Sequence, residues 1–218
     1  MYREIKGEEV LDFIQNRLQS DLPGSEAHFK MAPMARVTNK SRFAPNEKTR
    51  NGGVLILLYP EGNKLYFPLI LRPEDTGVHS GQVALPGGKR DEEDQDIIHT
   101  ALREAWEEVG VDVQRAQVLG QLSEIYIPPS NFLVSPTIAA IKERPVFNPS
   151  IHEVAQLILV DLEEFRYNNG KQMKEVTARY MKSTVPCYEL NGHTVWGATA
   201  MILSEFLSIL EEIDFKLA

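Results

Sequence analysis

The segment Gly87–Val111, GGKRDEEDQDIIHTALREAWEEVGV, constrains this chain more than any other. It opens with a Gly-Gly turn, continues through an acidic loop, and then has the pattern of a helix that ends at Gly110, a C-cap candidate. Its apolar residues recur at the three- and four-residue spacing of a buried helix face: Ile98, Leu102, Ala105 and Val109. The segment is therefore predicted to be a loop followed by a helix packed on the core.

Three carboxylates of this helix, Glu104, Glu107 and Glu108, stand at i, i+3 and i+4 and converge on one patch. Like charges at that spacing repel by a few tenths of a kcal/mol per pair, and a cation between them reverses the sign. Hard carboxylate oxygens suit Mg²⁺ or Mn²⁺. The alternative is a solvated acidic helix face, which is the usual meaning of a charge run.

The residues around these carboxylates resemble the Nudix hydrolase box, in which a glycine and a loop acid precede Arg-Glu-aliphatic-X-Glu-Glu-X-Gly-aliphatic. The match comprises Gly88, Arg103, Glu104, Ala105, Glu107, Glu108, Gly110 and Val111. The loop acid is Asp94 or Asp91, where glutamate is usual.

The interval from Gly88 to Arg103 is one residue longer than in the usual box, and this is similar to the coenzyme A pyrophosphatase branch of the family. That branch also carries a G-x-V-x-F-P-G-G lead-in, represented here by Gly81, Val83, Leu85, Pro86, Gly87 and Gly88. Leu85 replaces the phenylalanine. The residues between Arg72 and Gly81 match the branch poorly.

Composition excludes several other classes of protein. The 218 residues fit one domain with an elaboration, and the formal net charge of −8 argues against a nucleic-acid-binding surface. No apolar run approaches the ~20 residues that span a bilayer, and the N-terminal residues lack the apolar stretch of a secretory signal. The single cysteine, Cys187, fits a reducing compartment and is expected to be buried in a strand. We therefore expect a cytoplasmic protein without membrane or nucleic-acid partners.

Periodicity and turn residues predict the remaining elements. Helices are expected at 8–19, 162–165 and 198–213, and strands at 54–59, 65–72, 82–85, 118–125, 134–141, 154–160, 175–183, 186–190 and 193–196. Residues 126–131 are too proline-rich for a sheet interior. Asn191-Gly192 is a strong hairpin-turn signal.

Alternating strands and helices with a mixed sheet predict an α/β sandwich. This agrees with the Nudix-type α/β/α fold that the resemblance implies, in which a mixed β-sheet lies between helices and the box is a loop-helix-loop. The Nudix domain is expected over 53–218. Residues 1–52 are expected to form an N-terminal helix and an extended surface segment, in which His28 is interpreted as a loop histidine.

The resemblance implies metal-assisted cleavage of a diphosphate, with Glu104, Glu107, Glu108 and the Gly88 carbonyl as ligands of Mg²⁺ or Mn²⁺. Arg103 is expected to orient the carboxylates by pairing with Asp94 or Glu104. The general base is either Glu104 or Glu153, a glutamate of a kind that Nudix enzymes often bring to the site from outside the box.

Substrate-binding residues are expected near the box, although loop-capping or solvent-facing roles are equally simple for several of them. The candidates are Arg72, His79, Ser80, Gln82, Lys89, Arg90, Ser130 and Asn131. Arg72, Lys89 and Arg90 are the candidate phosphate contacts.

Three functions are consistent with these residues. The first is hydrolysis of coenzyme A or acyl-coenzyme A to 3′,5′-ADP and (acyl-)4′-phosphopantetheine. The second is hydrolysis of ADP-ribose or another dinucleotide-type diphosphate. The third is an inactive nucleotide-sensing module, against which the intact glutamate triad argues. The expected partner is a small nucleotide diphosphate, and assembly into a homodimer is left open.

Overall fold

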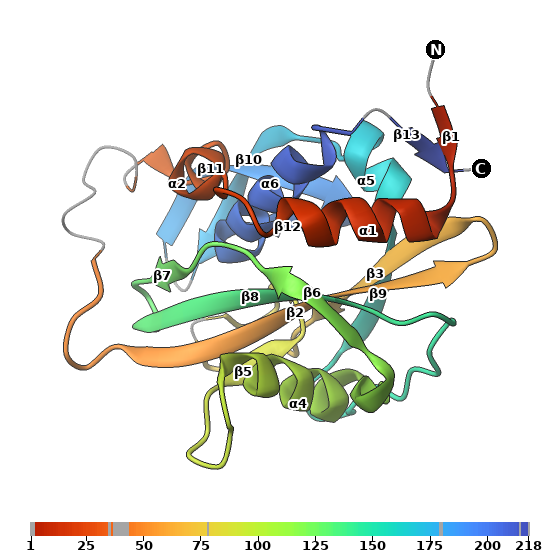
Figure 1. Ribbon diagram of the computed structural model, residues 1–218. Helices are drawn as coiled ribbons and strands as arrows, with labels where there is room; N and C mark the ends of the chain where they lie inside the picture. Colours follow the sequence, from red (N-terminus) through yellow and green to blue (C-terminus); the bar gives the residue numbers. More distant parts are fainter. Residues whose placement is uncertain are drawn as a thin grey trace.

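The computed structural model describes residues 3–34, 36, 44–77, 79–178, 181–213 and 215–217. In this part of the chain an eight-stranded mixed sheet lies between layers of helices (Figure 1). Helix α4 (Ile97–Val109) covers one face, and helices α1 (Gly7–Arg17), α2 (Gly24–Phe29) and α6 (Gly197–Leu210) lie on the other. The predicted α/β/α class is therefore confirmed.

The central sheet is built from β2 (Arg50–Glu61), β3 (Lys64–Leu71), β4 (Val83–Ala84), β5 (Gly87–Lys89), β6 (Gln117–Gln121), β7 (Ile125–Ile127), β8 (Phe132–Ala140) and β9 (Gln156–Asp161). The order along its main path is β4-β3-β2-β8-β6, with β5 beside β2, β7 beside β8 and β9 beside β3. Strands β2 and β8 pair in parallel, and the remaining pairs of this sheet are antiparallel.

Strand β2 is buried on both faces, as its unbroken apolar run predicts. Successive side chains of a strand point to opposite faces. Leu55 and Leu57 accordingly pack in the apolar cluster beneath α4, whereas Ile56 and Leu58 pack in the cluster beneath α1 and α6. The strand thus joins the two apolar layers on which the sandwich depends.

A second, three-stranded sheet contains β10 (Gln172–Ala178), β11 (Met181–Leu190) and β12 (His193–Trp196). The expected strand 175–183 wrongly combined the end of β10 with the start of β11, and the expected break before 186–190 was also wrong, because β11 runs without a break through Pro186. Pairing with β12 begins only at Cys187, so Pro186, which lacks a backbone donor, has a partner strand on one side only. Residues 179 and 180 of the first expected strand lie outside the described residues.

Two local predictions in this sheet are confirmed. Asn191 and Gly192 have φ values of 50° and 79°, the positive values that a tight primed hairpin turn requires, and Leu190 pairs with His193 across it. Cys187 is fully buried within β11. Both outcomes follow from chemistry local to a few residues.

Residues 126–131 were expected not to form a sheet interior, and only the first two of them belong to a strand, which pairs on one side alone among the described residues. Ile125–Ile127 forms β7 and pairs with β8, with Tyr126 opposite Leu133. The strand ends before Pro128, and Asn131 donates its backbone N–H to the Pro128 carbonyl to close the turn at 3.2 Å. Proline therefore limits the length of the strand without preventing it.

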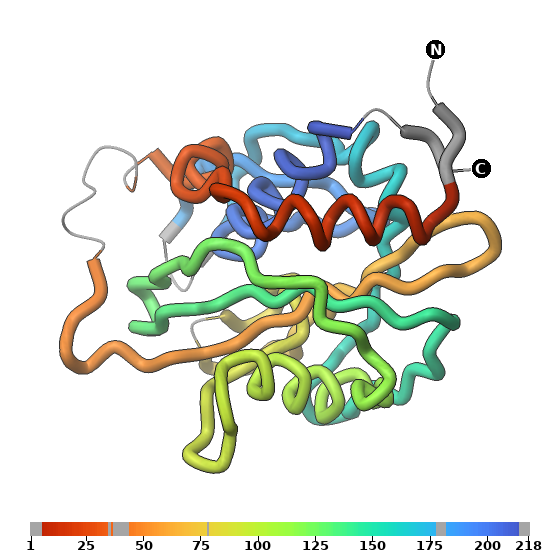
Figure 2. Tube along the Cα trace, viewed as in Figure 1, coloured from red at the N-terminus to blue at the C-terminus, as the bar shows by residue number. Residues whose placement is uncertain are grey.

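The N-terminal helices pack on the same core as the sheet. Val10 and Ile14 of α1 are fully buried, and α2 packs against α6, as the red and blue segments of Figure 2 show. Helix α2 lies in a stretch that was expected to lack regular structure, of which residues 35 and 37–43 lie outside the described part. Within the described ranges, no helix combines the length and apolar character that a membrane crossing needs.

His28 is part of α2 and is 5% exposed, so its interpretation as a loop histidine was wrong. Its Nε2 lies 3.0 Å from Oε2 of Glu205, a fully buried residue of α6. Glu205 also accepts hydrogen bonds from the backbone of Gly24 and from the backbone and hydroxyl of Ser123. Burial pushes the pKa of Glu205 upward, but the hydrogen bonds from His28 and Ser123 outweigh it and leave the pKa lowered.

Two short terminal strands, β1 (Arg3–Ile5) and β13 (Phe215–Leu217), pair in parallel. Helix α5 (Leu162–Asn168) follows β9, and Asp161 caps it by accepting from the backbone N–H groups of Glu163 and Glu164. These elements close the side of the sandwich opposite α4 (Figure 1).

Candidate active site

The box adopts the loop and helix that its sequence predicts. Asp96 caps the N-terminus of α4 by accepting from the His99 N–H at 2.7 Å. The helix ends at Gly110, which has φ of 69°, the left-handed conformation that favours glycine at this position. The predicted C-cap is therefore confirmed.

Glycines allow α4, β2 and β5 to pack so closely that no side chain fits between them. A Cβ on Gly53 would lie 2.6 Å from the Ile97 carbonyl oxygen at the start of α4, and one on Gly87 would lie 2.4 Å from the Gly53 carbonyl oxygen. A Cβ on Gly88 would lie 2.4 Å from the carboxylate of Glu104. Gly87 and Gly88, expected to form a turn, belong to strand β5, and their lack of side chains leaves room for the carboxylates of α4 beside that strand.

Glu108 is the most enclosed carboxylate of the box. Its side chain is 4% exposed, its Oε2 accepts the Gly87 N–H at 2.8 Å, and its Oε1 lies 3.5 Å from Nη1 of Arg72. Burial raises the pKa of Glu108 to about 7, against the opposing effects of the Gly87 N–H and Arg72. A buried carboxylate with a raised pKa lacks sufficient positive charge around it.

Glu104 stands beside Glu108 and is enclosed by Gly88 and Arg103. Burial raises its pKa, while the guanidinium of Arg103, 3.0 Å away, acts in the opposite direction. Smaller upward contributions to the pKa of both Glu104 and Glu108 come from the negative charge of Glu153. Glu153, proposed from outside the box, is therefore within electrostatic range of both.

Arg103 joins the acidic loop to the helix. Its Nε and Nη2 bind the two carboxylate oxygens of Asp94 at 2.9 and 3.0 Å, and Nη2 also donates to the Lys89 carbonyl. The Asp94 side chain is 1% exposed, and the Arg103 guanidinium holds its pKa well below the usual range. The predicted pairing of Arg103 with Asp94 and with Glu104 is confirmed, and Asp91 lies farther away at 3.7 Å.

The four predicted metal ligands do not surround a common point in the structure. Among the described side chains, no group of three or more acidic, histidine or cysteine residues is placed to hold a metal ion. Glu107 is 41% exposed and contacts Arg103 at 3.1 Å instead. The donor chemistry nevertheless fits a hard cation, because the buried Glu108 and the partly buried Glu104 place their carboxylates beside Gly87 and Gly88, where a side chain has no space.

The predicted substrate contacts in the 79–82 loop have partners within the loop. The Ser80 hydroxyl accepts the Asp75 N–H at 2.8 Å, which is the loop-capping alternative. His79 Nδ1 lies 3.2 Å from Oε1 of Gln82. These contacts shape the loop that follows Arg72.

Two further predicted residues have structural contacts that their sequence did not indicate. Asn131 has φ of 53°, its side-chain oxygen accepts from Thr49 and Tyr126, and its amide donates to the Lys48 carbonyl. The Ser130 carbonyl accepts from Arg50. This turn therefore anchors the chain just before β2.

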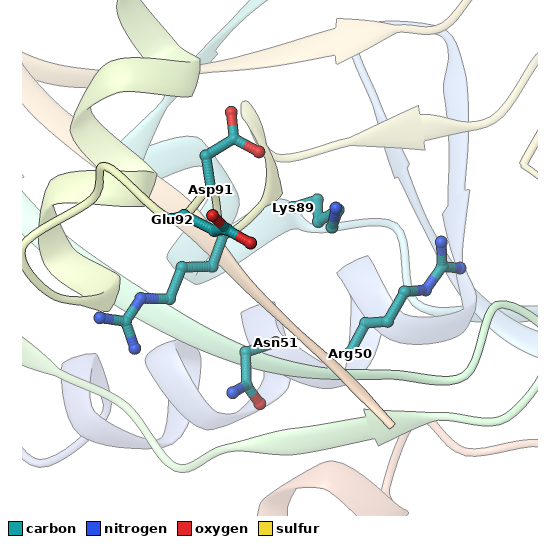
Figure 3. A pocket seen from close by; sticks show the side chains of 6 residues that line it. Arg50, Asn51, Lys89, Asp91 and Glu92 are labelled. Atoms are coloured by element: carbon teal, nitrogen blue, oxygen red, sulfur yellow. The ribbon is translucent and has the colours of Figure 1, made fainter. Parts of the chain in front are cut away.

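The predicted cations near the box differ in their surroundings. Arg72 faces Glu108, and Arg90 donates to the carbonyls of Asp94 and Gln95 at 3.2 Å each, so it supports the acidic loop. Lys89 lines a surface hollow of ≈ 290 Å³ together with Arg50, Asn51, Arg90, Asp91 and Glu92 (Figure 3). Sequence analysis missed Arg50 and Asn51, because they lie outside the box and only the pairing of β2 with β5 brings them there.

Comparison with known proteins agrees with this geometry. The family model described as the NUDIX domain matches residues 49–180. This span includes β2, the box and Glu153, and it covers more than half of the chain. The chain therefore belongs to the Nudix hydrolase family.

Relatives within the family include two coenzyme A diphosphatases. The chain is 33% identical to the peroxisomal coenzyme A diphosphatase ndx-8 of Caenorhabditis elegans, over 79% of this chain and 72% of that protein. It is 34% identical to the mitochondrial coenzyme A diphosphatase NUDT8 of Homo sapiens, over 62% of this chain and 58% of that protein. A longer match, 30% identical, covers 91% of this chain and 94% of the uncharacterized Nudix hydrolase NudL of Yersinia pestis.

Among solved structures, the chain is similar to a MutT/nudix family protein from Enterococcus faecalis. The TM-score is 0.50, with 15% sequence identity over 96% of this chain and 76% of that one. At this level of identity the likeness concerns the fold alone.

The ion pair between Arg103 and Asp94 predicts a pH-dependent stability. Replacing Asp94 by Asn should lower the free energy of unfolding at pH 7 by about 2 kcal/mol, since charge-assisted hydrogen bonds to a buried carboxylate are lost. The pKa of Asp94 is lower in the folded than in the unfolded chain, so its stabilisation is present above the ordinary value of about 3.9 and is lost below it. The difference from the wild type should therefore shrink as the pH falls below about 4.

Urea unfolding followed between pH 7 and pH 3 measures this difference. Glu93→Gln is the matched control, because Glu93 is an exposed carboxylate of the same loop. Equal stability of Asp94→Asn and the wild type at pH 7 would contradict the structural role of the ion pair.

Proposed function

We propose that the protein hydrolyses the diphosphate bond of coenzyme A or its thioesters, releasing 3′,5′-ADP and 4′-phosphopantetheine or its acyl form. Membership of the Nudix family supports the reaction class. The relatives named as coenzyme A diphosphatases, at 33% and 34% identity, support this substrate. The G-x-V-x-L-P-G-G lead-in and the longer box interval support the same choice.

The observation that carries the proposal is the pair of enclosed carboxylates, Glu104 and Glu108, beside Gly87 and Gly88 of β5. Burial raises the pKa of both, although Arg103 stands beside Glu104 and Arg72 beside Glu108. The packing of α4 against two glycine-containing strands keeps them in that position although they repel each other. A bound divalent cation would offset this repulsion between Glu104 and Glu108, which explains why the two carboxylates are kept together.

Glu104, Glu107, Glu108 and the Gly88 carbonyl are the residues proposed to hold Mg²⁺ or Mn²⁺. A bound divalent ion supplies neutralisation of the diphosphate charge and a more acidic water. Glu107 contacts Arg103 in the structure, so its part in this set requires its carboxylate to turn away from the guanidinium. The bidentate contact with Asp94 keeps Arg103 in place when that happens.

Glu153 is the proposed general base, with a carboxylate oxygen that accepts a proton from the attacking water. It lies outside the proposed ligand set, so its basicity is not lost to the metal. Its charge acts on both Glu104 and Glu108, which supports a place on the same side of the site. Arg72, beside Glu108, is the proposed contact for the diphosphate.

A panel of diphosphates tests the substrate. Purified protein with Mg²⁺ should cleave coenzyme A about ten- to a hundredfold more efficiently, in kcat/KM, than its 3′-dephospho form, because charge-assisted contacts to the 3′-phosphate are worth about 1.5–3 kcal/mol. Faster cleavage of ADP-ribose than of coenzyme A would instead support a nucleoside diphosphate hydrolase of different specificity. Binding without cleavage of any member of the panel would support the nucleotide-sensing alternative.

Replacing Glu107 by Gln tests the metal assignment. This variant should lose divalent-dependent turnover and keep its fold, because Glu107 is exposed and, within the described residues, its carboxylate forms an ion pair only with Arg103. Glu164→Gln, at an exposed position of α5, is the control with the same change of charge. Activity of Glu107→Gln equal to the wild type across a Mg²⁺ titration would overturn the assignment.

Replacing Glu153 by Gln tests the base. We expect kcat to fall by roughly 10²–10⁴-fold with little change in substrate binding, since a general base contributes about that factor. Steady-state kinetics give kcat, and calorimetric titration of the substrate in Ca²⁺ gives the affinity. A decrease in kcat of less than about threefold would return the role of the base to Glu104.

A further inference from the structure

The surface hollow beside β5 contains two cations that the proposed catalytic residues do not use. Lys89 is the last residue of β5, and Arg50 is the first residue of β2. Both line the hollow, and both are exposed (Figure 3). Among the described residues, neither one forms an ion pair with a carboxylate, although the chain as a whole is strongly acidic.

The strand register brings these two side chains to the same face. Lys89 lies directly opposite Gly52 in the antiparallel pair, and Arg50 stands two residues before Gly52. Residues at i and i+2 of a strand share a face, and diagonal neighbours lie about 7–8 Å apart. In Figure 3 the Lys89 ammonium and the Arg50 guanidinium lie on one side of the hollow, away from Asp91 and Glu92.

Arg50 is held in position before any ligand binds. Its guanidinium carbon stands 4.2 Å from the centre of the Phe132 ring, and Nη2 donates to the Ser130 carbonyl at 2.8 Å. An arginine fixed in this way loses less side-chain entropy when it binds an anion. Only part of its donor set is used, so further N–H groups remain for a ligand.

Gly52 allows close packing beneath the hollow. A Cβ on Gly52 would lie 2.7 Å from the Gly88 carbonyl oxygen and 3.2 Å from Cδ1 of Phe132. A larger residue would separate Phe132 from the strand and shift the arginine that stacks on it. The close packing of Gly52 therefore supports the position of Arg50 beside Lys89.

The hollow and the proposed catalytic centre are lined by adjacent residues of β5. Gly88 faces Glu104, and Lys89, the next residue, points to the opposite face of β5. Within the described residues β5 pairs only with β2, so its other edge is open. A molecule bound across this edge would contact the carboxylates of α4 on one face of β5 and the side chains of Arg50 and Lys89 on the other face.

We propose that Arg50 and Lys89 form a binding site for a phosphate monoester carried by the substrate, which in coenzyme A is the 3′-phosphate. The inference rests on the proposed function for the identity of the substrate. Of the cations near the box, Arg72 contacts Glu108 and Arg90 supports the acidic loop, which leaves Lys89 and Arg50 for this role.

The ratio of kcat/KM for coenzyme A to that for 3′-dephospho-coenzyme A tests the site. In Arg50→Gln and in Lys89→Gln this ratio should fall about threefold to tenfold from its wild-type value, because each variant removes one of the two charged contacts that together give the ten- to hundredfold preference. Arg50→Lys should give a ratio between those of the wild type and Arg50→Gln. The lysine keeps the positive charge but lacks the paired N–H donors of the guanidinium and its stacking on Phe132. Arg115→Gln, at an exposed cation paired with Glu143, should leave the ratio unchanged.

A binding measurement separates this inference from the proposed function. Calorimetric titration with 3′,5′-ADP and with 5′-AMP should give at least tenfold tighter binding of 3′,5′-ADP, and Arg50→Gln and Lys89→Gln should each reduce that preference. If the wild type cleaves neither form of coenzyme A, the proposed function fails and this titration alone decides the site. Equal affinities for the two nucleotides, or a preference that survives in both variants, would overturn the inference.

Discussion

The arrangement of this molecule depends on the close approach of three backbone segments, which only glycine permits. Gly53, Gly87 and Gly88 bring β2, β5 and α4 so near one another that a single Cβ on any of them would overlap a neighbour. This contact fixes the height of α4 above the sheet. It thereby sets where Glu104 and Glu108 stand, because both extend from α4 toward Gly87 and Gly88 of β5.

The charged residues of the box act on that framework in two ways. Asp94, almost fully buried, fixes Arg103 by a two-point contact, and Arg103 in turn reaches Glu104, Glu107 and the backbone of Lys89. The loop and the helix are therefore held as one unit. On the inner side, burial leaves Glu108 with a pKa of about 7 despite the Gly87 N–H, which is the electrostatic condition that favours binding of a cation.

The N-terminal segment contributes to the opposite layer of the sandwich. Its buried His28 contacts Glu205, a carboxylate in the interior of α6 that four hydrogen-bond contacts satisfy. A buried carboxylate with this many partners ties α2 and the segment after β6 to α6, and its removal would leave buried polar groups without their hydrogen-bond partner. Helix α1 shares the apolar cluster of this layer with Ile56 and Leu58 of β2, and α2 packs against α6.

The sequence by itself determined the box helix, its cap at Gly110 and the Asn191-Gly192 hairpin, because each depends on spacing or turn chemistry within a few residues. It also determined the α/β class, because strands and helices alternate along the chain. The pairing of Arg103 with Asp94 was predictable for the same reason. Only the tertiary structure decided the contacts between distant segments. It brought His28 to Glu205 across 177 residues, and it brought Arg50 beside Lys89 through one strand register. Hydrophobic periodicity identifies which face of an element is buried, but it does not specify which distant polar side chain will lie against that face.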